Sequence, residues 1–140
     1  MFISLGPDIA VAAQISADDC ARAHAAGFGV IVCNRPDGED AGQPDAAEIA
    51  AAAAAAGLRF AHIAVDARGI DDDQIAAMAS ELAGGGKVLA YCRSGTRSTN
   101  LWALAAASRG GDADAIIAAA AGGGYNIAPM RGMLVRLAGG

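Results

Sequence analysis

The chain has 140 residues, of which 54% are hydrophobic and 18% charged, and it carries a formal net charge of -5. That length fits one compact domain of ~150 residues, and the hydrophobic content excludes collagen-like and disordered chains. Because the net charge is negative and no cluster of Lys or Arg occurs, we expect no nucleic acid as a partner.

The expected compartment follows from hydropathy and from the cysteines. The alanine run at residues 49–57 is far shorter than the ~20 residues that cross a bilayer. The start, MFISLGPDIA, lacks the basic segment and the sustained apolar core of a signal peptide. The cysteines Cys20, Cys33 and Cys92 are odd in number and widely spaced, which argues against a disulfide framework. We therefore expect a cytoplasmic protein with no membrane partner.

Short apolar runs alternate with longer alanine-rich runs along the chain. This pattern is typical of the α/β class, with a mostly parallel central sheet flanked by helices. No internal repeat, linker or domain boundary is visible, so we expect one domain over residues 1–140. In chain order, the expected elements are strands at 3–5 and 9–12, a helix at 16–27, a strand at 29–33, a helix at 44–57, a strand at 59–65, a helix at 71–86, a strand at 87–91, and helices at 98–109, 112–121 and 129–138.

Local signals set the limits of these helices. Ser16 is a favoured N-cap residue, and Gly27 is in a position to end the helix that Ser16 begins. The acids at 71–73 suit the start of a helix, where its dipole favours negative charge. The helix that ends at Gly57 consists almost entirely of alanine. Alanine favours the helix but offers little bulk, so Ile49 must provide much of its packing.

The informative segment is KVLAYCRSGTRS, in which a buried strand ends at Tyr91 and a helix begins shortly after Cys92. Backbone N–H groups in such a loop point inward, and the N-terminus of the following helix adds about half a positive charge. Arg97 adds a guanidinium suited to bidentate binding of a tetrahedral oxyanion. Gly95 permits the tight turn. The segment therefore predicts an anion site in which Cys92 is a reactive thiolate.

The other cysteines and the histidines give no such signal. A cysteine is more often a small buried hydrophobic residue, and we assign that role to Cys20 and Cys33. The histidines His24 and His62 are too far apart to indicate a metal site, and no nucleotide-binding motif is present. We expect His24 at the surface and His62 in a structural role. The sequence thus favours an enzyme that depends on the Cys92 thiolate and needs no cofactor.

The motif CRSGTRS at 92–98 follows two upstream motifs, NRPDGED at 34–40 and GQP at 42–44. In this order they resemble the bacterial phosphatase-like family of beta-lactamase hydrolase-like proteins, over nearly the whole chain. The resemblance implies the fold of dual-specificity protein tyrosine phosphatases and a small anionic or phosphorylated substrate. It implies that Cys92 is the nucleophile of a covalent mechanism and that Arg97 clamps the anion. The other anion contacts that we expect are Arg93, Ser94, Gly95, Thr96 and Ser98.

The loop departs from the phosphatase signature in its length. Four residues stand between Cys92 and Arg97, where phosphatases of that fold have five, and Tyr91 replaces their usual histidine. This spacing is similar to that of rhodanese sulfurtransferases, although GGGYNIAPMRGML lacks the closing pattern of that family. Phosphatase-like hydrolysis is the first hypothesis, and sulfur transfer through a persulfide on Cys92 is the second. A third, a non-catalytic anion-binding module, is disfavoured because Cys92 and Arg97 are both present.

Hydrolysis of a phosphomonoester also requires a general acid for the leaving group. By the same resemblance this acid is an aspartate on a loop before the cysteine. Asp66, directly after the strand at 59–65, is the first candidate. Asp37 in the NRPDGED loop is the second, with Arg35 as a further anion contact. An ordinary turn or capping role remains an alternative for both aspartates.

Overall fold

The computed structural model describes residues 1–139 of the chain. Within them, strands and helices mostly alternate along the sequence. The strands are β1 (Ile3–Gly6), β2 (Ile9–Ala12), β3 (Phe28–Cys33), β4 (Arg59–His62) and β5 (Lys87–Tyr91). The helices are α1 (Ala17–Ala25), α2 (Ala46–Ala55), α3 (Asp72–Ala83), α4 (Thr96–Ser108), α5 (Ala113–Gly122) and α6 (Arg131–Gly139), with the 3-10 helix η1 (Ala128–Met130) before α6.

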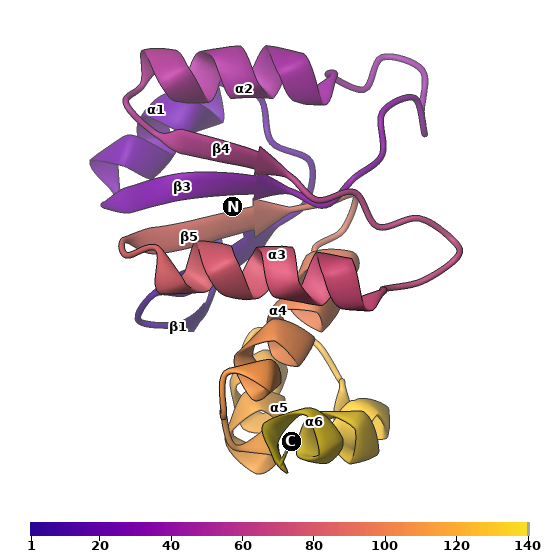
Figure 1. Cartoon of the computed structure of the whole chain (residues 1–140). Coiled ribbons are helices and arrows are strands. Elements are labelled where there is room, and N and C mark those ends of the chain that lie inside the picture. Colours follow the sequence, from indigo (N-terminus) through magenta and orange to yellow (C-terminus); the bar gives the residue numbers. More distant parts are fainter. Residues whose placement is uncertain (140) are drawn as a thin grey trace.

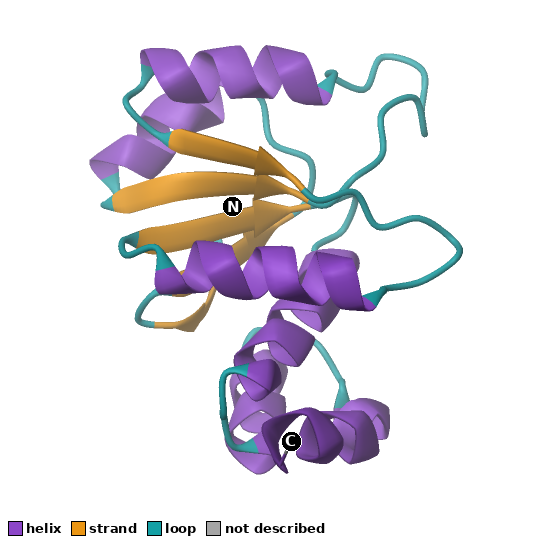
Figure 2. Ribbon diagram, in the orientation of Figure 1, coloured by secondary structure: helices purple, strands orange, loops and turns teal. Residues whose placement is uncertain are grey.

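The strands form one sheet in the order β1-β2-β5-β3-β4. β1 pairs antiparallel with β2, and every other neighbouring pair is parallel. Helices α1 and α2 cover one face of this sheet, and α3 with the later helices lies on the other (Figure 1). The expected α/β class, with a mostly parallel central sheet flanked by helices, is confirmed (Figure 2).

Burial on both faces explains the continuous apolar runs of the central strands. Along β3, Val30 and Val32 pack on the side of α3 and α4, whereas Ile31 and Cys33 pack on the side of α1 and α2. Side chains alternate between the faces of a strand, so a strand covered on both faces is apolar throughout. In α2, Ile49 is fully buried, which confirms its expected packing role.

Several element limits differ from those expected. β4 ends at His62 rather than at residue 65, because its partner β3 ends at Cys33. Beyond that point, the amide of Ile63 donates to the carbonyl oxygen of Cys33, and the amide of Val65 donates to that of Asn34. α4 begins at Thr96, two residues early, since Gly95 adopts a left-handed conformation and serves as its N-cap. The helix expected at 129–138 is divided into η1, which has proline in its first turn, and α6.

The parallel strands bring the predicted motifs together. Their carboxyl ends meet at one edge of the sheet, where the loops after β3, β4 and β5 gather (Figure 2). This edge is where ligands bind in open α/β sheets. Separately, none of the helices within residues 1–139 has the length and apolar content that crossing a membrane requires.

Candidate active site

Cys92 lies at the base of the loop between β5 and α4. Its side chain is buried, and its backbone N–H donates to the carbonyl oxygen of Ala12 in β2 at 3.2 Å. The Gly95 N–H donates to Cys92 Sγ at 3.1 Å, a contact that stabilises negative charge on sulfur. Gly95 has a φ of 90°, a conformation that side chains other than glycine rarely adopt. The expected tight turn around the sulfur is therefore present.

Contacts from outside the loop hold it in this shape. The Tyr125 hydroxyl donates to the Ser94 carbonyl oxygen at 3.0 Å, and a side chain at Gly95 would collide with that hydroxyl. The Ser98 hydroxyl donates to Asn34 Oδ1 at 2.8 Å and is buried. Ser98 was expected to contact the anion, but its hydroxyl instead joins α4 to the loop after β3. No local pattern points to Tyr125, because it lies 31 residues from Ser94 in the chain.

Arg97 is fixed by a carboxylate that the sequence analysis also did not single out. Its two terminal nitrogens donate to the two oxygens of Glu39 at 2.8 and 2.9 Å, and one of them also donates to the Val65 carbonyl oxygen at 2.8 Å. The hydrogen bond with Glu39 raises the pKa of Arg97, burial opposes this, and the charge of Cys92 raises the pKa further. Arg97 thus lies within electrostatic reach of the Cys92 sulfur.

Glu39 is the acid that joins the NRPDGED loop to the cysteine loop. Besides Arg97, it accepts a hydrogen bond from Arg35 Nε at 2.9 Å. Its hydrogen bond with Arg97 is the main reason that its pKa falls from 4.5 to about 2; burial opposes the fall and Arg35 adds to it. Glu39 is therefore ionised throughout the neutral range. Its position in NRPDGED, two residues after Asp37, was the available signal.

Arg35 is buried, and each of its three guanidinium nitrogens donates a hydrogen bond within the protein. In addition to Glu39, it donates to Gln14 Oε1 at 2.9 Å and to Asp40 Oδ2 at 2.6 Å. Its side chain is only 4% exposed, so the structure places it as a support of this loop and not as an open anion contact. Asp40 also lies 3.5 Å from Arg93 Nε, which is on the cysteine loop.

The two candidate acids have different surroundings. Asp37 Oδ1 accepts the backbone N–H of Ala46 at 2.8 Å and so caps the start of α2. Asp66 and Arg97 both line a hollow of about 340 Å³. Hydrogen bonds from Arg68, the shortest at 2.8 Å, hold the pKa of Asp66 below its ordinary value. The structure therefore places Asp66 on a hollow that Arg97 also lines, whereas the Asp37 carboxylate is engaged at the start of α2.

The remaining singled-out residues have the expected surroundings. Cys20 and Cys33 are buried, and burial raises the pKa of both thiols. His24 is exposed. His62 Nε2 is 2.9 Å from the Arg35 carbonyl oxygen, a structural contact at the end of β4.

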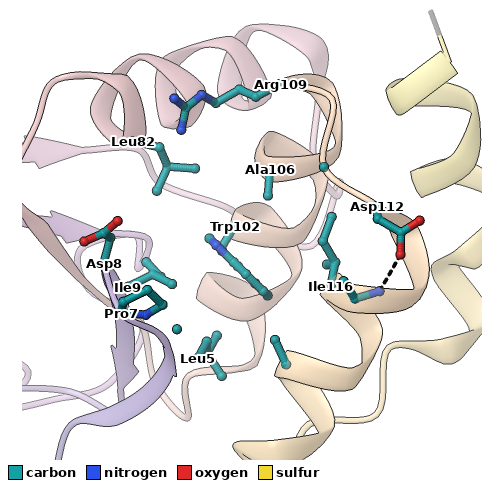
Figure 3. A pocket seen from close by; sticks show the side chains of 14 residues that line it. Leu5, Pro7, Asp8, Ile9, Leu82, Trp102, Ala106, Arg109, Asp112 and Ile116 are labelled. Atoms are coloured by element: carbon teal, nitrogen blue, oxygen red, sulfur yellow. Dashed lines mark hydrogen bonds between the residues drawn. The ribbon is translucent and has the colours of Figure 1, made fainter.

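A second hollow, of about 380 Å³, lies at the opposite edge of the sheet, beside the turn between β1 and β2. Figure 3 shows the side chains that line it. It is lined by Trp102 and by the turn between β1 and β2, with Asp8 and Arg109 among its charged residues. Asp112 in this hollow caps α5 through the Ala115 N–H at 2.9 Å. None of the residues that the sequence analysis proposed for chemistry lines it.

Residues 2–109 match the family described as "Beta-lactamase hydrolase-like protein, phosphatase-like domain". A beta-lactamase hydrolase-like protein of Agrobacterium fabrum is 34% identical over 109 residues, which are 77% of this chain and 25% of that protein. The chain thus spans about a quarter of the length of the curated relatives it matches.

Two solved structures extend the likeness beyond the matched segment. A candidate phosphatase from Neisseria meningitidis is 34% identical, with a TM-score of 0.77 and coverage of 96% of this chain and 97% of that one. The protein Tk-PTP in its active form has a TM-score of 0.69 at 16% identity, with coverage of 98% and 95% respectively. The fold is that of the protein tyrosine phosphatases.

Proposed function

From the membership of this chain in the phosphatase-like domain family of beta-lactamase hydrolase-like proteins, we propose that it hydrolyses phosphomonoesters with Cys92 as the nucleophile. Its motifs had indicated the same family. The hydrogen bond from the Gly95 N–H to Cys92 Sγ, at 3.1 Å, carries the proposal. It places the sulfur at the N-terminus of α4, where backbone N–H groups without helical partners favour an anion. Arg97, the second residue of that helix, supplies the positive charge.

The proposed reaction has two steps. The Cys92 thiolate attacks phosphorus, an S–P bond forms, and the bond between phosphorus and the ester oxygen breaks as that oxygen takes a proton from Asp66. A water molecule then attacks phosphorus and gives a proton to the Asp66 carboxylate, the S–P bond breaks, and the thiolate and inorganic phosphate result. Arg97 and the loop amides stabilise the charge on the phosphoryl oxygens, while Glu39 orients Arg97.

Asp66 is the better candidate for the acid because of its neighbours. Asp37 is engaged at the start of α2, and moving it would leave the Ala46 amide without this partner. To act as the acid, Asp66 must instead give up its hydrogen bonds with Arg68 and contact the ester oxygen of the substrate. The Arg68 side chain is 92% exposed, and solvent screens an exposed ion pair of this kind. The exchange therefore costs little.

Turnover of an aryl phosphate by the purified protein tests the proposal. Wild type and Cys20→Ser should hydrolyse it, since Cys20 lies on α1 and is buried in the core against Ile49 of α2. Cys92→Ser should have no measurable activity. The same three proteins are also assayed for transfer of sulfur from thiosulfate to cyanide. Hydrolysis that persists in Cys92→Ser would exclude Cys92 as the nucleophile.

Sulfur transfer is the second candidate, and the loop length favours it. Four residues separate Cys92 and Arg97, as in the rhodanese spacing, and this chemistry needs no general acid. The outer sulfur of thiosulfate would pass to Cys92 with release of sulfite, and cyanide would then take it to form thiocyanate. The family supports the phosphatase reaction instead. Sulfur transfer without hydrolysis of any aryl phosphate would reverse this order.

A further inference from the structure

The hollow of about 340 Å³ that Arg97 lines has two charged residues, Arg97 and Asp66, and an otherwise mostly apolar wall. We propose that it binds the organic group of the substrate, and that the substrate is a phosphomonoester of a small apolar alcohol or phenol. This inference rests on the proposed phosphatase function. The wall is formed by the loop after β4, by α4, and by the segment of η1 and α6, chiefly through Ile70, Leu104, Met130 and Met133.

The roles proposed for the two charged residues determine what must lie against the wall. In the proposed reaction, Arg97 holds the phosphoryl oxygens and Asp66 protonates the ester oxygen. Both residues line this hollow, so the carbon bonded to the ester oxygen lies next to its remaining lining. That lining is apolar except for Asn100. A sugar or a peptide backbone would lose hydrogen bonds to water there, whereas an apolar group gains from burial.

The methionines in the wall fit a binding role. The Met133 side chain is 46% exposed, and few other large hydrophobic side chains within residues 1–139 are as exposed. A flexible thioether adapts to apolar ligands of different shapes. The volume lies near the lower end of the ~300–1,000 Å³ typical of ligand sites, which suits one ring or a short chain.

The wall also indicates where this specificity is encoded. Met130 and Met133 lie beyond residue 109, where the family match ends. The C-terminal segment of this chain therefore supplies part of the organic-group site, whereas the cysteine loop that binds the phosphoryl group lies within the matched segment.

Binding of two non-hydrolysable phosphonates, measured by titration calorimetry, tests the inference without turnover. Benzylphosphonate and methylphosphonate share the anionic group and differ in apolar bulk. Wild type should bind benzylphosphonate at least tenfold more tightly. Met133→Ser should reduce this ratio at least threefold and leave methylphosphonate binding unchanged. Val135→Ser is the matched control, because Val135 is 45% exposed on the same helix and does not line the hollow.

Each outcome decides one of the two proposals. Equal affinity for the two phosphonates, no binding of either one, or a ratio that Met133→Ser leaves unchanged overturns the organic-group site. If aryl phosphates are nevertheless hydrolysed, the proposed function survives that result. A benzyl preference that depends on Met133, in a protein that hydrolyses no phosphomonoester, supports the hollow as a site and rejects the reaction.

Discussion

Glu39 is the residue on which the geometry of the site most depends, because it connects Arg97 to Arg35 through one carboxylate. Three loops meet at these contacts: the loop after β3, the cysteine loop, and, through the Val65 carbonyl oxygen, the loop after β4. A guanidinium held at two points loses little freedom when an anion binds, which is the condition for electrostatic catalysis by a fixed charge.

The Glu39 contacts predict a pH dependence of stability. The pKa of Glu39 falls from 4.5 to about 2 on folding, so its contribution is fully present above pH 4.5 and is lost as the pH falls toward 2. Glu39→Gln should therefore reduce the free energy of unfolding more at pH 6 than at pH 3.5. Urea unfolding of both proteins at the two pH values measures this difference. An equal reduction at both values would contradict the ion pairing.

Arg68 predicts a shift in the pH dependence of the reaction. Its hydrogen bonds hold the pKa of Asp66 below the ordinary value of 3.8, and a general acid acts only while it is protonated. Arg68→Ala should raise that pKa in the free enzyme and therefore move the fall of kcat/KM to higher pH, measured with an aryl phosphate. Arg22→Ala, which removes an exposed arginine on α1, should leave the profile unchanged.

Replacement of the candidate acid itself, in Asp66→Asn, tests its role in the reaction. It should lower the turnover of a substrate with a poor leaving group by at least ~10²-fold, the usual lower value for general acid catalysis. Asp37→Asn should instead weaken the start of α2 and keep most of the activity. The reverse pattern would assign the acid to Asp37.

At the scale of elements, α2 depends on one large side chain. Ile49 is fully buried in an otherwise alanine-rich helix that packs against the sheet. Ile49→Ala should reduce the free energy of unfolding by ~2–5 kcal/mol, measured by urea unfolding. Ala51→Ser, at an exposed position of the same helix, should change it by less than ~1 kcal/mol. A small effect of Ile49→Ala would mean that α2 contributes little to the core.

Elements whose signals are local were predictable from the sequence. Ser16 and Asp19 form the reciprocal capping contacts of α1, and Asp71 caps α3 through the Gln74 amide. The end of β4 was not predictable, because it is set by where β3 ends. The division of the last helix into η1 and α6 was not predicted either, because the apolar pattern continues through Met130 and Met133.

Only the part of the site that is continuous in the sequence, the cysteine loop, was predictable. The turn of the cysteine loop and its connection to α4 follow from glycine chemistry and from the dipole of the helix. Glu39, Tyr125 and Gln14 reach the site by tertiary contacts across 58, 31 and 21 residues of sequence. No spacing rule predicts such pairs from a single sequence. The same reason explains why Arg35 was taken for an anion contact and not for a buried support.

At the scale of the whole molecule, the C-terminal helices share a core with the sheet. Leu134 of α6 and Ile116 of α5 belong to the same buried cluster as Val30 and Val88, although they lie beyond the family match at residue 109. We therefore propose that residues 1–140 fold as one unit. Fluorescence of Trp102, which is in that cluster, and far-ultraviolet circular dichroism should give the same urea midpoint. Two separate midpoints would contradict a single unit.

The central claim is that Cys92 carries the phosphoryl group during turnover. Its most direct test is acid quenching of the protein during hydrolysis of an aryl phosphate, followed by mass spectrometry of the intact chain and its peptides. The account predicts one phosphoryl group on the peptide that contains Cys92, and none in Cys92→Ser. An added sulfur atom after incubation with thiosulfate, together with no phosphoryl adduct and no phosphate release, would contradict it.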